Sequence, residues 1–200
     1  MEQIFFVVNN VLALCISSIL AYRFLKHRTA ALVLLGTAVL FPVIILLTLL
    51  SLGALERLYS KWVLLLLILL LIICRLGREQ KPGMRFLQNR RTLLLGAALL
   101  LAGVIGGYTG GRYVFTGTHF AFDDLSYHAT AVGQWVSHHS IWAGPYNYHY
   151  HNPMNAEVLS LWWVLPFEQD GFAFLSGLYW LAVTCLAVFV LCGRLAAPVW

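Results

Sequence analysis

The chain has 200 residues, of which 60% are hydrophobic and 10% are charged, and its mean hydropathy is +0.79. Soluble globular proteins carry roughly 25% charged residues, so this composition excludes an ordinary soluble domain. The formal net charge of +5 is compatible with nucleic-acid binding, but the basic residues gather in short connectors between apolar runs. We therefore interpret the positive charge as a signal of membrane topology and expect no nucleic-acid partner.

Five apolar segments are candidates to cross a hydrocarbon layer about 30 Å thick, which takes on the order of 20 helical residues. They are residues 4–25, 30–55, 59–76, 92–108 and 172–195. The first has no basic region before it and no small-residue cleavage site, so we interpret it as a span and not as a signal peptide. The sequence thus predicts an all-α, polytopic integral membrane protein with about five transmembrane helices.

The distribution of Lys and Arg predicts the orientation. Connectors 23–28 and 75–91 hold nine of the 13 basic residues, and Arg194 adds a tenth on the same side. Basic connectors stay in the cytoplasm, which places the N-terminus, the link at 56–61 and a long loop at 109–171 on the extracytoplasmic side. We expect a bacterial inner (plasma) membrane.

The long loop holds six of the seven histidines and is expected to contain two juxtamembrane helices. The first begins at Asp123 or Asp124 and is broken by Gly144 and Pro145. One face of it carries an apolar stripe and another carries polar and aromatic residues, with Trp135 and Trp142 at headgroup level. The stripe comprises Leu125, Ala129, Val132 and Val136, and the other face Asp124, His128 and Trp135.

The second loop helix is predicted over residues 153–165. Asn152 is a good N-cap, Pro153 suits the first helical position, and Pro166 marks the end. About 13 residues cannot span a bilayer, so this helix stays on the outer side or is re-entrant. Trp162 and Trp163 are expected to pack against lipid or neighbouring helices.

The loop carboxylates are candidate catalytic groups. Asp123 and Asp124 stand side by side, with Tyr127 and His128 one helical turn later. One aspartate can simply cap the helix, but acidic groups at the edge of hydrocarbon are costly, and a carboxylate there can act as general base on a hydroxyl nucleophile. Glu157, expected to face outward from the second helix, is a candidate second carboxylate.

The loop histidines and one arginine are candidate phosphate ligands. His149 and His151 precede the second helix, whose N-terminus already favours an anion, and Arg112 is the nearest strong cation. The two histidines can equally be hydrogen-bonded interface residues. The histidine spacing lacks the paired ligands of helical zinc sites, so no protein metal site is predicted, although Asp124 can contact a divalent cation.

The segments FDDLSYH and YHNPMNAEVLSLWWVLP, followed by DG before the last span, resemble the first outer loop of GT-C superfamily membrane glycosyltransferases. The similarity is to protein O-mannosyltransferases and lipid A aminoarabinose transferases, and more closely to uncharacterised bacterial members. It covers residues 92–195, and the three earlier spans carry none of it. By position in the motif, Asp123 matches the catalytic base, Asp124 and Tyr127 match the acidic residue and the tyrosine that follow it, and His151 matches the phosphate contact, with Asn152 inserted before Pro153.

The resemblance implies transfer of a sugar from a polyprenyl-phosphate donor to an acceptor hydroxyl at the outer face, with inversion at the anomeric carbon. It divides the chain into three N-terminal spans (1–91) and the start of a catalytic module (92–200). Expected partners are the polyprenyl-phosphate sugar lipid and membrane lipids. We expect the chain to be the N-terminal part of a longer protein and inactive alone. The alternative is a multi-pass transporter or membrane-complex subunit whose His-rich loop binds a metal or a partner.

Overall fold

The computed structural model describes residues 2–26, 28–76, 129–143, 155–168, 173 and 175–195. Within these residues every regular element is an α-helix, which confirms the predicted all-α class. The helices are α1 (Glu2–Leu25), α2 (Ala30–Ala54), α3 (Ser60–Leu76), α5 (Ala129–His138), α6 (Asn155–Val164) and α7 (Leu175–Leu195).

Three of these helices, α1, α2 and α7, are long and apolar enough to cross a membrane. Helix α3 has 17 residues, at the lower limit of a spanning helix, so its crossing remains a prediction. The predicted span at 92–108 lies outside the described residues. The structure thus supports a membrane protein, while the predicted number of five spans stays a prediction.

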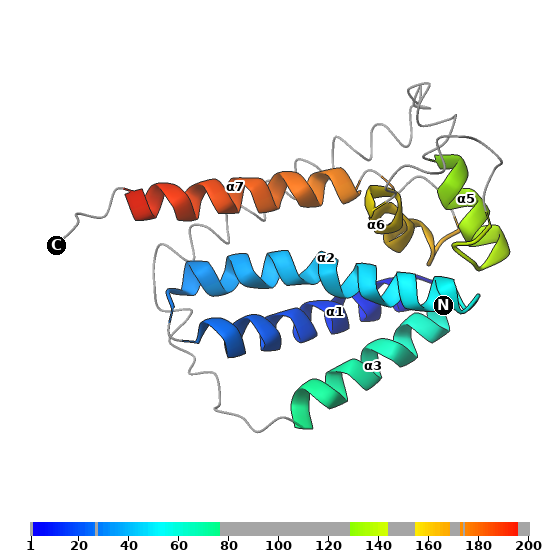
Figure 1. Cartoon of the computed structure of the whole chain (residues 1–200), viewed down its shortest axis with the longest axis horizontal. Helices are drawn as coiled ribbons and strands as arrows, with labels where there is room; N and C mark the ends of the chain where they lie inside the picture. The colour runs from blue at the N-terminus through cyan, green and yellow to red at the C-terminus, as the bar shows by residue number, and fades with distance from the viewer. Residues whose placement is uncertain are drawn as a thin grey trace.

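Helices α1 and α2 form an antiparallel pair, and α3 packs mainly on α1 (Figure 1). The buried face of α1 repeats every three or four residues and uses small side chains such as Ala13, Ser17 and Ala21. Gly36 on α2 meets Ala21, where a Cβ added to the glycine would lie 3.5 Å from the alanine Cβ. Small residues let apolar helices approach closely, since in lipid packing replaces the hydrophobic effect as the driving force.

Helices α5 and α6 lie together at one end of this bundle, which we call the capped end (Figure 1). The capped end is where α1 begins, α2 ends and α3 begins. Helix α7 leaves it and runs along α2 to the opposite end, where the side chain of Arg23 on α1 donates a hydrogen bond to the carbonyl oxygen of Cys74 on α3. This relative arrangement agrees with the predicted topology, and α6, with 10 residues, lies at the capped end as expected.

A proline determines how α7 joins α2. Pro42 lies inside α2 and has no N–H to donate to the carbonyl oxygen of Ala38, four residues earlier. The hydroxyl of Tyr179 on α7 donates to that carbonyl, and the Tyr179 ring packs on Phe41 with centroids 5.4 Å apart. Because a backbone oxygen without a partner is costly in an apolar environment, this bond pairs α7 with one position on α2.

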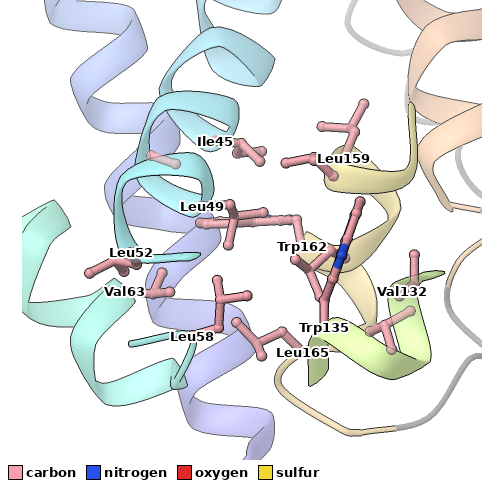
Figure 2. Packing of buried hydrophobic residues seen from close by; sticks show 14 of the residues in the cluster. Ile45, Leu49, Leu52, Leu58, Val63, Val132, Trp135, Leu159, Trp162 and Leu165 are labelled. Carbon is pink, nitrogen blue, oxygen red and sulfur yellow. The ribbon is translucent and has the colours of Figure 1, made fainter. Parts of the chain in front are cut away.

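The core of the capped end lies where α5 and α6 meet the last turns of α2 (Figure 2). Trp135 from α5 and Trp162 from α6 are each 3% exposed, and Leu49 from α2 is fully buried against them. Val132 and Val136 of the predicted apolar stripe are buried, which confirms this part of it, while Leu125 lies outside the described residues. The prediction for Trp135 was wrong, because its ring faces the core and not the headgroup region.

Candidate functional site

The loop between α2 and α3 is joined to the end of α5 by hydrogen bonds from backbone and side-chain atoms. The N–H of Leu58 donates to the His139 carbonyl at 3.0 Å, and Nδ1 of His139 donates to the Leu58 carbonyl at 3.2 Å. The His139 ring also stacks on Tyr59 with centroids 3.8 Å apart. These contacts give His139 a structural role in holding α5 to the bundle.

His139 also ends α5. Its φ of 54° is left-handed, and the following N–H, that of Ser140, donates back to the Trp135 carbonyl at 3.2 Å. This is the geometry of a helix C-cap, which commonly uses a residue in the left-handed region. The predicted break at Gly144 and Pro145 was therefore placed too late, since α5 ends at His138.

Close backbone contact brings the segment after α5 onto the end of α2. The N–H of Ile141 donates to the Gly53 carbonyl at 3.3 Å, and a Cβ added at Gly53 would lie 2.4 Å from Cγ2 of Ile141. Trp142 is 70% exposed, and its indole N–H donates to the Ala54 carbonyl at 3.0 Å. This exposure fits the predicted interfacial position of Trp142.

A hydrogen-bond chain through an intramembrane asparagine fixes α6 to α1. The indole N–H of Trp162 donates to Oδ1 of Asn10 at 3.1 Å, and Nδ2 of Asn10 donates to the Phe6 carbonyl at 2.8 Å. Phe6 also contacts Trp163 and Phe167, with ring centroids 5.9 and 5.1 Å away. The prediction that both tryptophans pack against lipid or neighbouring helices is confirmed, and Trp162 is held by a specific polar contact as well.

Glu157 is the predicted site residue that the structure describes. It lies in the first turn of α6 and is 5% exposed, so the expectation that it faces outward was wrong. The adjoining Val158 and Leu159 are buried as well, because α6 packs between α2, α5 and α7. A carboxylate in the first turn is favoured by the partial positive charge of the helix N-terminus, which offsets part of the cost of burial.

The other predicted site residues lie outside the described residues. They are Asp123, Asp124, Tyr127, His128, His149, His151 and Arg112. Their expected convergence on one cavity therefore remains a prediction. Within the part of the chain that the structure describes, no group of three or more His, Cys, Asp or Glu side chains is arranged to hold a metal ion.

An apolar groove of about 400 Å³ lies between α1, α2 and α7, beside α6. Phe41 and Leu186 form part of its floor, Val11 and Leu14 line its α1 side, and Trp163 lies at its α6 end. The hydrophobic pattern of the sequence did not predict this groove. A detectable signal was present, since Asn10 is an amide within an apolar span and such residues are costly unless they make a contact.

Comparison of the chain with protein-family models, with curated proteins and with solved structures found no match. Within its described residues, the structure itself defines the class of an all-helical protein with helices able to cross a membrane.

Proposed function

We propose that the protein is a membrane glycosyltransferase that moves a sugar from a polyprenyl-phosphate-linked donor to an acceptor hydroxyl at the extracytoplasmic face. The observation that carries this proposal is the anchoring of both loop helices at the capped end, by the contacts of His139 on α5 and Trp162 on α6. Except for Arg112, the candidate groups lie within six residues of these helices in the sequence or inside them. An extended chain covers at most about 3.6 Å per residue, so groups a few residues from an anchored helix stay near it.

The proposed reaction assigns one role to each group. The carboxylate of Asp123 takes the proton of the acceptor hydroxyl while its oxygen attacks the anomeric carbon of the donor. The bond from that carbon to the phosphate oxygen breaks, and polyprenyl phosphate leaves with the electron pair. His149, His151 and Arg112 stabilise the negative charge on the departing phosphate. Attack from the face opposite the phosphate inverts the anomeric configuration.

Further roles fall to the remaining polar groups. Asp124 supports Asp123 or contacts a divalent cation bound with the phosphate, while Tyr127 and His128 line the sugar site. Glu157, held inside the capped end by α6, is the proposed second carboxylate that orients the acceptor or the sugar by accepting hydroxyl hydrogen bonds. A carboxylate on a packed helix is positioned more accurately than one on a loop.

The test uses the complete protein extracted gently from its own membranes. Native mass spectrometry is expected to find a bound lipid with the mass of a polyprenyl phosphate carrying a sugar. Turnover is then measured as release of polyprenyl phosphate from that lipid. Asp123→Asn should lower turnover by about 10²–10⁴-fold, the usual contribution of a general base, while lipid binding persists. Glu157→Gln should lower turnover as well.

The matched control is Glu168→Gln, which changes an exposed carboxylate just after α6. Turnover in this variant should equal that of the wild-type protein. Normal turnover in Asp123→Asn, or a preparation that holds phospholipids alone, would remove the basis for the proposal.

A further inference from the structure

The groove between α1, α2 and α7 lies between the two ends of these helices, at the level of the apolar layer that they would cross. Helices α1 and α7 both pack on α2, and the groove separates them from each other. Its floor is formed by side chains shielded from solvent, among them Phe41 at 6% and Leu186 at 2% exposure, while Val11 and Leu14 at its edge are 52% and 50% exposed. The groove is therefore open sideways, toward the hydrocarbon of a bilayer.

The lining of the groove selects an apolar occupant. Three of its polar side chains are already engaged: the Tyr179 hydroxyl donates to Ala38, Oγ1 of Thr37 donates to the Val33 carbonyl at 3.0 Å, and Asn10 is bonded to Phe6 and Trp162. Among the described residues, the indole N–H of Trp163, at the α6 end of the groove, has no hydrogen-bond partner. Away from Trp163 a polar headgroup would find no partner in the groove, whereas a hydrocarbon chain loses nothing by leaving the bilayer and gains close contacts. Its volume of about 400 Å³ lies in the usual range of ligand pockets.

The position of the groove gives the direction of that chain. Along α7 it extends from Tyr179 to Leu186, about 10 Å at 1.5 Å per residue, and it begins beside Trp163 of α6. A chain lying in it has its polar end at the capped end, where α5 and α6 are anchored. On α2 the lining residues run from Leu34 to Phe41, in the half of the helix farther from the capped end, so the groove accommodates a stretch of the lipid chain deeper than the headgroup.

We infer that this groove binds the isoprenoid chain of the lipid-linked donor, an inference that rests on the proposed function. It assigns a role to α1 and α2, which form two of the three walls and lie before the region that resembles glycosyltransferases. The N-terminal spans are a lipid-binding part of the enzyme, and their groove aligns the donor so that its phosphate reaches the loop residues above α6.

The test uses two substitutions, on different helices that line the groove, each of which fills it with a larger side chain. Ala182 on α7 and Val11 on α1 both line it, and Ala182→Phe and Val11→Trp each place an aromatic ring in the space of the chain. The control is Ala187→Phe, which adds the same ring to the same helix at a half-buried position that does not line the groove. Each complete protein is checked for monodisperse elution and analysed by native mass spectrometry for bound lipid.

Ala182→Phe and Val11→Trp should each lower the occupancy of the lipid-linked sugar by about tenfold, the effect of displacing about two methylene groups from the groove. Occupancy in Ala187→Phe should be unchanged. Two outcomes overturn the inference while the proposed function stands: wild-type occupancy in both filled variants, or loss of phospholipid alone. If the wild-type protein itself holds no lipid-linked sugar, the proposed function and this inference both fail.

Discussion

The joint between α2 and α7 allows a quantitative test of how this helix pair is held. Tyr179→Phe keeps the ring that packs on Phe41 but removes the hydroxyl that donates to the Ala38 carbonyl. That carbonyl has no helical donor because Pro42 lacks an N–H. Leaving an acceptor without its partner costs about 1–3 kcal/mol, and hydrogen bonds between membrane helices fall at or below the lower part of that range. We expect the free energy of unfolding to fall by about 0.5–1.5 kcal/mol.

A second substitution tests whether the unpaired Ala38 carbonyl causes this loss of stability. Pro42→Ala restores a backbone N–H that can donate to the Ala38 carbonyl, so Tyr179→Phe should cost little in that background. The double-mutant cycle should therefore give a coupling energy of about 0.5–1.5 kcal/mol. The free energies are measured by reversible unfolding of the purified protein in mixed micelles titrated with a denaturing detergent. An equal cost of Tyr179→Phe in both backgrounds would refute the reasoning.

Two further predictions concern the capped end and the topology. Trp162→Phe removes a donor that is used and should lower stability by about 1–3 kcal/mol in the same assay. Trp163→Phe removes a buried indole N–H that has no hydrogen-bond partner within the described part of the chain, so it should cost clearly less; equal costs would contradict the role given to the Trp162 bond. In a background with all four cysteines replaced, single cysteines at exposed Arg57 and Ser137 should react with an impermeant maleimide from the extracytoplasmic side, and one at exposed Lys26 only from the cytoplasmic side. Labelling of Arg57→Cys and Ser137→Cys from opposite sides would exclude the predicted topology.

Sugar transfer and lipid binding can be tested separately in this protein. Substitutions at Asp123 and Glu157 act on turnover while lipid remains bound, whereas Ala182→Phe acts on lipid occupancy. A protein that binds the lipid without transferring the sugar would thus be distinguished from one that binds no such lipid. The first result would favour the alternative of a non-enzymatic membrane subunit with affinity for the same lipid.

The sequence by itself determined the helices. The apolar runs at 4–25, 30–55 and 59–76 agree with α1, α2 and α3 to within a few residues, and the short helix predicted at 153–165 agrees with α6 at Asn155–Val164. Helix position depends on local hydrophobicity and on the residues that start and stop a helix, and all of these lie within the segment that forms it. The charge asymmetry likewise predicted that the ends of α1 and α3 lie at the same end of the bundle, where Arg23 contacts Cys74.

Only the tertiary structure decided which faces of those helices are buried. Trp135 and Glu157 were expected at the surface, and both are buried because α5 and α6 pack against each other and against α2. His139, which caps the end of α5, is bonded to Leu58, 81 residues away in the chain. The groove is lined by residues of α1, α2 and α7, and the bond from Tyr179 to the carbonyl that Pro42 leaves open joins two of these helices. Each of these features is a contact between distant segments, and periodicity within one segment carries no information about the partner that covers it.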